Sequence, residues 1–273
     1  KLINHIHGFG IALKYFTTPL FNNNILIKLY SKYRDYIIRF SDGVIVSADI
    51  KSFNDFALKY NLKKTFRINN FADQKIFHKI IDKSRLRNEL NINNEDIIII
   101  TVGRLNKVKG YDLLINSFYL FLKHQLNSSL IIIGEGEERC NLESIIKNLK
   151  LSTKVKLLGY KEAKEIALWL NCADLFAFCS YEEAFPIALI EALCCGLPVI
   201  STDVVGVTDM VINGVTGYRI RQRNPDEFCQ AMIRGLQNRE ELSKNAIELG
   251  KKYNPEVVGG QIANHIKSLL LPR

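Results

Sequence analysis

The sequence lacks the features of several special protein classes. Its longest apolar runs, such as residues 97–100 and 130–133, have the length of a strand, whereas a membrane-spanning helix needs about 20 apolar residues. Asn4, His5 and His7 interrupt the first apolar residues, which is not the pattern of a secretory signal. Internal repeats and low-complexity tracts are also absent. These absences favour an ordinary globular protein.

Cysteine pairs with the spacing of a redox or zinc motif are missing as well. The six cysteines include no Cys-x-x-Cys pair, and several lie in apolar runs, where a free cysteine behaves as a small hydrophobic residue. This pattern favours a reducing compartment, so we expect a cytoplasmic protein. The formal net charge of +9 predicts an anionic partner, such as a nucleotide, an acidic membrane surface or nucleic acid.

Segments with strand and helix patterns alternate along the chain, as in parallel sheets whose strands are joined by crossover helices. The expected strands of the first part are 2–6, 43–47 and 64–68, and its expected helices are 25–40 and 53–60. The expected strands of the second part are 97–102, 130–133, 155–158, 174–178 and 198–201. We place the domain boundary in the polar segment that follows the turn-rich stretch 69–73, so the predicted domains are residues 1–85 and 86–273. Ligands bind at the carboxyl edge of such sheets.

The first candidate site follows the strand expected at 97–102. Residues 103–110 read Gly-Arg-Leu-Asn-Lys-Val-Lys-Gly and lead into a helix. Arg104 and Lys109 would lie beside the positive N-terminus of that helix, which predicts a diphosphate site. A solvated basic loop is the alternative interpretation.

Two glycines, Gly134 and Gly136, follow the next strand. Paired glycines let a ligand approach the backbone closely, although they also occur in simple turns. The third glycine of the dinucleotide fingerprint is absent, so a nicotinamide cofactor is not expected. No aspartate triad is evident that would hold a divalent metal, so a metal is not expected either.

The most specific segment is residues 180–200. Pro186 is suited to the first turn of a helix, with Glu183 just before it and Glu191 about two turns further on. Seven residues separate the two carboxylates, and this spacing predicts that they lie on roughly the same helix face. Glu191 interrupts an apolar stripe, where a carboxylate is costly unless it is hydrogen-bonded. A ribose diol is one suitable partner, and a salt bridge within the protein is the alternative.

Four segments resemble, in order and spacing, the C-terminal domain of the family 4 glycosyltransferases, which are retaining enzymes of the GT-B fold. These segments are residues 103–110, 134–136, 180–196 and 202–217. The resemblance extends more weakly to residues 1–77, where 69–73 match a Pro-Asn-Gly-Val-Asp-type turn. It implies an α/β protein of two Rossmann-like domains with parallel sheets, the first domain incomplete. It also implies that the last helix packs back on the first domain.

The resemblance implies roles for individual residues. Arg104 and Lys109 match the pair that holds the donor diphosphate, and Glu191 matches the glutamate that binds the nucleotide ribose. Glu183 matches the glutamate near the donor sugar, and His7 matches a histidine beside the reacting carbon, although a lone histidine is more often structural. The implied catalytic residues are Glu183, His7, Arg104 and Lys109. The implied donor-binding residues are Gly103, Arg104, Lys109, Gly134, Gly136, Glu183, Phe185, Pro186, Ile187 and Glu191.

The sequence departs from the family pattern at three places. Ala184 stands where the family often has glycine, which predicts a mildly strained backbone. Asp209 stands where the family has a glutamate, which shortens the acid by one carbon. The glycine-rich loop after the first N-terminal strand has no counterpart here, and the chain begins with Lys1 inside an expected strand. We therefore expect the chain to be a fragment that lacks the first part of its N-terminal domain.

The resemblance implies a metal-independent enzyme that moves a sugar from a UDP- or GDP-linked donor to a glycan or lipid-linked acceptor in cell-surface polysaccharide or lipopolysaccharide assembly. It implies no nucleic acid partner. The basic, aromatic helix expected at 25–40 could lie on an anionic membrane at the inner face of the cell membrane, or it could be a core-facing helix with a solvated basic face. A sugar-nucleotide epimerase and a non-catalytic nucleotide-sugar-binding module stay open as alternatives.

Overall fold

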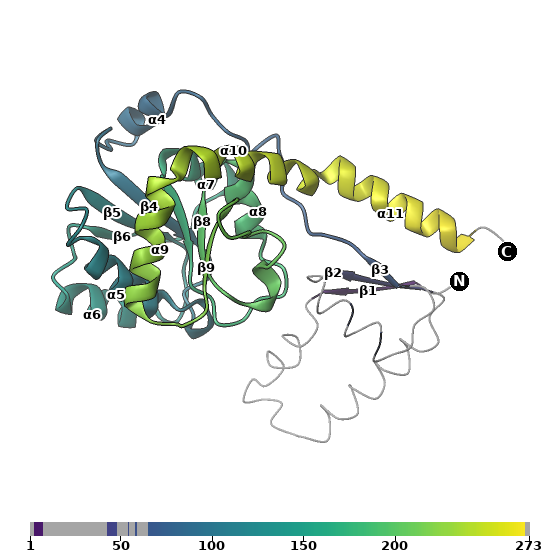
Figure 1. Cartoon of the computed structure of the whole chain (residues 1–273), viewed down its shortest axis with the longest axis horizontal. Helices are drawn as coiled ribbons and strands as arrows, with labels where there is room; N and C mark the ends of the chain where they lie inside the picture. Colours follow the sequence, from purple (N-terminus) through teal and green to yellow (C-terminus); the bar gives the residue numbers. More distant parts are fainter. Residues whose placement is uncertain (1–2, 8–42, 48–53, 55–57, 59–64, 271–273) are drawn as a thin grey trace, which may run out of the picture.

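The computed structural model describes residues 3–7, 43–47, 54, 58 and 65–270. It contains a three-stranded and a six-stranded sheet, and every pairing between their strands is parallel (Figure 1). The predicted α/β fold with parallel sheets is therefore confirmed. The predicted helix 25–40, and all of helix 53–60 except residues 54 and 58, lie outside the described residues.

The small sheet has the order β1-β2-β3. Its strands are β1 (Ile3–His7), β2 (Gly43–Ser47) and β3 (Thr65–Arg67). Each of them lies where the sequence predicted a strand. His7 ends β1 and pairs with Ser47 at the end of β2, so it lies at the carboxyl edge of this sheet.

The large sheet has the order β6-β5-β4-β7-β8-β9. Its strands are β4 (Ile97–Val102), β5 (Ser128–Ile133), β6 (Val155–Leu157), β7 (Leu175–Phe178), β8 (Val199–Thr202) and β9 (Gly217–Ile220). The first strand along the chain is central, and the direction of winding reverses between β4 and β7, as in the Rossmann fold. The sequence did not predict β9, because this edge strand carries half-exposed Tyr218 and Arg219 and lacks an apolar run.

Helices cover both faces of the large sheet. They are α4 (Lys83–Glu89), α5 (Tyr111–Phe121), α6 (Arg139–Asn148), α7 (Ala163–Cys172), α8 (Ile187–Cys194), α9 (Pro225–Gln237) and α10 (Arg239–Gly250), followed by α11 (Pro255–Leu270). Short 3-10 helices occur at η2 (Lys107–Lys109), η3 (Val205–Val207) and η4 (Lys251–Tyr253). None of the described helices is both long and apolar enough to cross a membrane.

The core consists of one hydrophobic layer on each face of the large sheet. Successive side chains of β4 point to opposite faces, so Ile99 packs with Phe118 of α5 and Phe228 of α9. Ile98 and Ile100 belong to the opposite layer, which contains the apolar side of α8. The unbroken isoleucine run of β4 follows from this arrangement, because a strand buried on both faces has no polar side.

The helix α4 lies across the predicted domain boundary at residues 85 and 86. Its Lys83 and Arg87 form ion pairs with Asp174, at the start of β7. We propose that the boundary lies before Lys83, because these contacts join α4 to the six-stranded half. The last helix, α11, extends from that half towards the small sheet (Figure 1).

Candidate functional site

The candidate site lies where the winding of the large sheet reverses, at the carboxyl ends of β4 and β7. These two strands are neighbours, with Ile99 opposite Leu175 and Ile100 opposite Phe176. The loops that follow them are residues 103–110 and 179–186. In open parallel sheets this position forms the crevice in which ligands bind.

Two close backbone contacts join these loops. The Tyr181 amide donates a hydrogen bond to the Val108 carbonyl at 2.7 Å. Gly110 has a φ of 62°, and a Cβ atom there would lie 2.3 Å from the carbonyl oxygen of Cys179. A glycine is therefore required where the loops touch. The contacts hold the loop that carries Lys109 against the loop that carries Glu183.

Lys109 and Glu183 meet in this crevice. The Lys109 ammonium forms an ion pair with Oε1 of Glu183, and the Ser180 hydroxyl donates to the same oxygen at 2.9 Å. The ammonium also lies 5.6 Å from the centre of the Phe178 ring, within the range of a cation–π contact. The two charged side chains are only 23% and 13% exposed, so water screens their attraction incompletely.

The loop after β5 packs against the loop after β4 at both predicted glycines. A Cβ atom at Gly134 would lie 2.0 Å from the carbonyl oxygen of Gly103, and one at Gly136 would lie 2.2 Å from that of Leu105. Packing between loops thus explains both glycines without a ligand, and their contact with a donor stays a prediction. Arg104, on the same loop, is exposed.

Glu183 lies just before α8, as predicted, so only Glu191 lies on the helix and the two carboxylates do not share one helix face. The helix α8 begins at Ile187, and Pro186 before it has an extended backbone with ψ near 118°. Phe185, directly before Pro186, is disfavoured in helical conformation, so the helix does not extend back to Glu183, which lies in the preceding loop. No side-chain hydrogen bond from the described residues caps the first turn of α8, which lies at the carboxyl edge of the sheet, and Ile187 there is 48% exposed.

Glu191 lies on the second turn of α8 and is mostly buried. Its carboxylate has no hydrogen bond and no ion pair within the part of the chain that the structure describes. Burial raises the pKa of this carboxyl group from 4.5 to about 7. A salt bridge to a described residue, the structural alternative for Glu191, is therefore not formed.

Phe185 contributes its backbone rather than its ring to the edge of the crevice. The ring is 6% exposed and packs against Tyr253 with the ring centres 6.0 Å apart. The Phe185 carbonyl accepts a hydrogen bond from the Asn70 amide at 2.9 Å. Asn70 belongs to the turn-rich stretch 69–73, so the connection between the two sheets touches the loop that carries Glu183.

Sequence reasoning missed several residues that shape the site. Ser180 contacts Glu183, and the Thr202 hydroxyl donates to the Ser180 carbonyl at 2.6 Å. A Cβ atom at Gly206 would lie 2.6 Å from the Glu183 carbonyl oxygen. The available signal was a small polar residue or a glycine just beyond an apolar strand, which is too common to identify a site alone.

The departures from the family pattern have local explanations. Ala184 is not among the described residues with a positive φ, so the predicted strain is not observed. Asp209 forms an ion pair with Arg67 at the end of β3.

The side chain of His7 lies outside the part of the chain that the structure describes. Among the described residues, no group of three His, Cys, Asp or Glu side chains could hold a metal ion.

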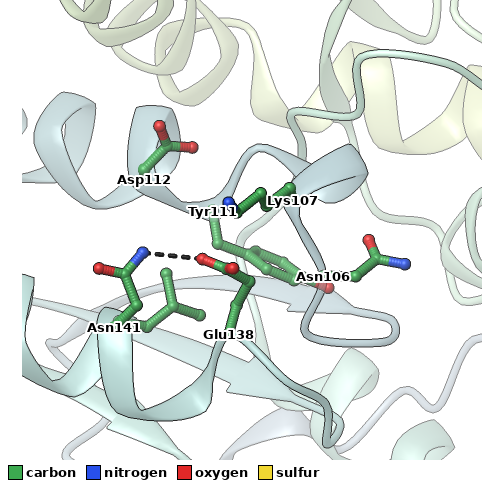
Figure 2. A pocket seen from close by; sticks show the side chains of 7 residues that line it. Asn106, Lys107, Tyr111, Asp112, Glu138 and Asn141 are labelled. Carbon is green, nitrogen blue, oxygen red and sulfur yellow. Dashed lines mark hydrogen bonds between the residues drawn. The ribbon is translucent and has the colours of Figure 1, made fainter. Parts of the chain in front are cut away.

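A separate hollow of about 150 Å³ lies behind the Lys109 loop, between α5 and α6 (Figure 2). Its lining residues are Asn106, Lys107, Tyr111, Asp112, Glu138, Asn141 and Leu142. None of the predicted site residues lines it. Among the lining residues, the Asn141 amide donates a hydrogen bond to the Glu138 carboxylate at the start of α6 (Figure 2), and its length is 2.7 Å.

Comparison with known protein families gives one match over most of the six-stranded half. The sequence model of the family described as "Glycosyl transferases group 1" matches residues 82–253. The matched range contains every predicted site residue except His7.

The curated relatives that resemble the chain in sequence include two enzymes with named activities. N-acetyl-alpha-D-glucosaminyl L-malate synthase of Bacillus anthracis is 27% identical over 254 residues, which cover 92% of this chain and 62% of the relative. Alpha-monoglucosyldiacylglycerol synthase of Acholeplasma laidlawii is 32% identical over 175 residues, which cover 63% of this chain and 44% of the relative. The chain thus spans less than two thirds of the length of either relative.

Solved structures share the fold. The HepE protein of Anabaena, in complex with UDP and glucose, matches with a TM-score of 0.79 at 23% identity, covering 98% of this chain and 71% of HepE. Sucrose-phosphate synthase of Thermosynechococcus elongatus matches with a TM-score of 0.80 at 23% identity, covering 98% of this chain and 67% of that protein. These neighbours confirm the predicted α/β fold with parallel sheets.

Proposed function

This chain belongs to the group 1 glycosyl transferases, and we propose that it binds a nucleotide-sugar donor in the crevice between β4 and β7 for sugar transfer to an acceptor. The contact between Lys109 and Glu183 carries this proposal. It brings a cation and a carboxylate from two separate loops to the point where parallel sheets bind ligands.

Lys109 and Arg104 would hold the diphosphate of the donor. Both come from the loop after β4, and the N–H groups at the start of α8 face the same edge of the sheet. Cations and a helix N-terminus attract a diphosphate most strongly when the sugar–phosphate bond breaks and negative charge grows on the leaving group. They would therefore lower the barrier to transfer as well as bind the donor.

Glu191 would hold the ribose of the nucleotide. Its carboxylate is mostly buried and unpartnered among the described residues, and burial raises its pKa to about 7. Two neighbouring ribose hydroxyls can both donate to one carboxylate, which would remove the cost of burying the charge. Glu183 would meet the donor sugar, because it lies ahead of α8 and beside the cation assigned to the diphosphate.

We propose further that transfer proceeds with retention and without a metal ion, with His7 on the sugar from the facing domain. The donor would be UDP- or GDP-linked, and HepE, which binds UDP and glucose, favours the uridine form. The acceptor would be a glycan or a lipid-linked molecule used in cell-surface assembly. The relative named as alpha-monoglucosyldiacylglycerol synthase favours a lipid and a peripheral position at the inner face of the cell membrane.

Calorimetric titration with UDP, GDP and uridine tests this function. Lys109→Ala should weaken binding of the selected nucleoside diphosphate by about 2–3 kcal/mol, and Arg104→Ala by about 1.5 kcal/mol, because each removes a charge-assisted bond. The loss at Lys109 should be the larger, because it also leaves the Glu183 charge uncompensated beside the diphosphate. Uridine binding should change little in both variants.

Lys107→Ala is the matched control, because Lys107 lies in the same short helix η2 but lines the hollow of Figure 2. It should bind nucleotide almost as the unmodified chain does. Equal losses for all three lysine and arginine variants would indicate a diffuse charge effect and contradict the assigned site. Conversion of a nucleotide sugar to its epimer, without an acceptor, would favour the epimerase alternative instead.

A further inference from the structure

The Glu183 carboxylate is restrained on one oxygen only. Lys109 and Ser180 both contact Oε1. Oε2 has no hydrogen-bond partner within the described part of the chain. The side chain is 13% exposed, so a ligand that reaches this carboxylate would meet Oε2.

Ser180 is fixed before any ligand binds. It is 1% exposed and lies just beyond the end of β7. Its carbonyl accepts the hydrogen bond from Thr202, at the end of β8, and its neighbour Tyr181 is bonded to Val108. Two strands and the Lys109 loop therefore define where the Ser180 hydroxyl lies.

We propose that Ser180 is a positioning residue that holds Oε1 of Glu183, so that Oε2 is presented to the hydroxyl groups of the donor sugar. The proposal rests on the proposed function, since it takes Glu183 as the carboxylate that meets the sugar. A hydroxyl group suits this task because it donates one hydrogen bond and adds no charge. Lys109 then remains the cation that attracts the diphosphate.

Removal of the Ser180 hydroxyl should lower the affinity for the donor only when the donor carries its sugar. Without the Ser180 hydroxyl, only the flexible Lys109 side chain holds Oε1, so the orientation of Oε2 is less restrained and must be ordered in part when a donor binds. The nucleotide part of the donor does not contact this carboxylate. Removal of the hydroxyl should therefore weaken the contribution of the sugar and leave the contribution of the nucleotide intact.

Calorimetric titration of the 273-residue chain with UDP and with UDP-N-acetylglucosamine separates these contributions, and GDP with GDP-mannose serves if guanine is the preferred base. Ser180→Ala should raise the dissociation constant of the nucleotide sugar by about 3- to 10-fold, which corresponds to one hydrogen bond. The dissociation constant of the free nucleoside diphosphate should stay within about 2-fold of the native value. Ser180→Thr, which keeps the hydroxyl, should recover most of the loss.

A double-variant comparison distinguishes positioning from a general structural role. Adding Ser180→Ala to Glu183→Ala, which leaves no side-chain oxygen for Ser180 to hold, should weaken binding of the nucleotide sugar no further than Glu183→Ala alone. A further loss in the double variant, or equal losses for diphosphate and nucleotide sugar in Ser180→Ala, would overturn the proposal. If Ser180→Ala does not fold, Thr202→Val releases the Ser180 carbonyl and should show the same dependence on the sugar.

The two proposals fail in different ways. Absence of nucleoside diphosphate binding by the unmodified chain would overturn the proposed function. Normal diphosphate binding, a clear effect of Glu183→Ala on the nucleotide sugar and no effect of Ser180→Ala would overturn the positioning role alone.

Discussion

The mostly buried carboxylate of Glu191 destabilises the free protein and, in the proposed function, binds the ribose of the nucleotide. Its carboxyl pKa of about 7 in the folded chain compares with an ordinary value of 4.5, and burial is the cause. As the pH rises above 4.5, the unfolded chain releases this proton before the folded chain does. Ionisation therefore favours unfolding over the range from pH 4.5 to 7, and the penalty reaches up to about 3 kcal/mol above pH 7.

We predict that Glu191→Gln raises the melting temperature at pH 8 and has little effect near pH 4.5, because glutamine is neutral at every pH. A saturating nucleotide sugar should remove the advantage at pH 8, since the ribose would satisfy the native carboxylate. Calorimetric unfolding of both chains with and without UDP-glucose provides the measurement.

Glu95→Gln is the control for this prediction, because Glu95 is exposed on a turn. Its melting temperature should follow that of the native chain at both pH values. A melting temperature of Glu191→Gln at or below the native value at pH 8 would mean that the carboxylate is already satisfied in the free protein.

At the scale of elements, Asp174 joins three parts of the six-stranded half. It is 3% exposed and accepts from the Ile98 amide of β4 at 2.8 Å. Its oxygens also form ion pairs with Lys83 and Arg87 of α4 and with Arg239 of α10, at 2.7–2.8 Å. Although burial would raise the Asp174 pKa, the neighbouring Lys83 ammonium and these hydrogen bonds hold it below its usual range.

Asp174→Asn should lower the free energy of unfolding by about 3–5 kcal/mol at pH 7, because Arg87 would remain buried, and Lys83 partly buried, without a counter-charge. Urea unfolding measures the loss. Glu89→Gln breaks an exposed ion pair with Arg85 in the same helix and should cost less than about 0.5 kcal/mol. Similar losses for the two variants would show that the buried network contributes no more than a surface pair.

At the scale of the whole molecule, two described segments cross between the two sheets. Residues 66–74 run from β3 along the six-stranded half, where the Ala72 amide donates to the Tyr253 carbonyl at 3.2 Å. The helix α11 returns, and its Val258 is buried against Ile68. His265 of α11 stacks on Phe66 with the ring centres 4.3 Å apart. The two crossings therefore pack on each other.

Val258→Asp should separate α11 from residues 66–68, because it places an unpaired charge in a buried apolar contact. We expect faster hydrogen exchange in residues 66–68 and 255–270 and a nucleotide dissociation constant within about 2-fold of the native value, since no candidate donor-binding residue lies in α11.

Val257→Asp is the matched control, because the neighbouring Val257 is 46% exposed while Val258 is 1% exposed. Its hydrogen exchange should remain native. A large loss of nucleotide affinity in Val258→Asp alone would show that the site depends on how the two crossings are held together.

Local sequence patterns predicted most strands because burial on both faces requires an unbroken apolar run. The five predicted strands of the second part differ from β4–β8 only at their ends. The strand β9 was not predicted, because an edge strand pairs with a neighbour on one side only and tolerates polar side chains. The start of α8 at Ile187 agrees with the prediction that a helix begins near Pro186 and leaves Glu183 just before it, because proline restricts the local backbone.

The amino-acid sequence by itself determined the fold class, the order of the parallel strands along the chain and the chemical groups that follow each strand. These depend on apolar periodicity and local backbone preferences, which neighbouring residues carry. Only the tertiary structure decided that Lys109 meets Glu183, that Ser180 holds the same oxygen and that Glu191 is left without a described partner. Those relations join residues from different loops, and their positions are set by how β4, β7 and β8 pair and how their loops pack.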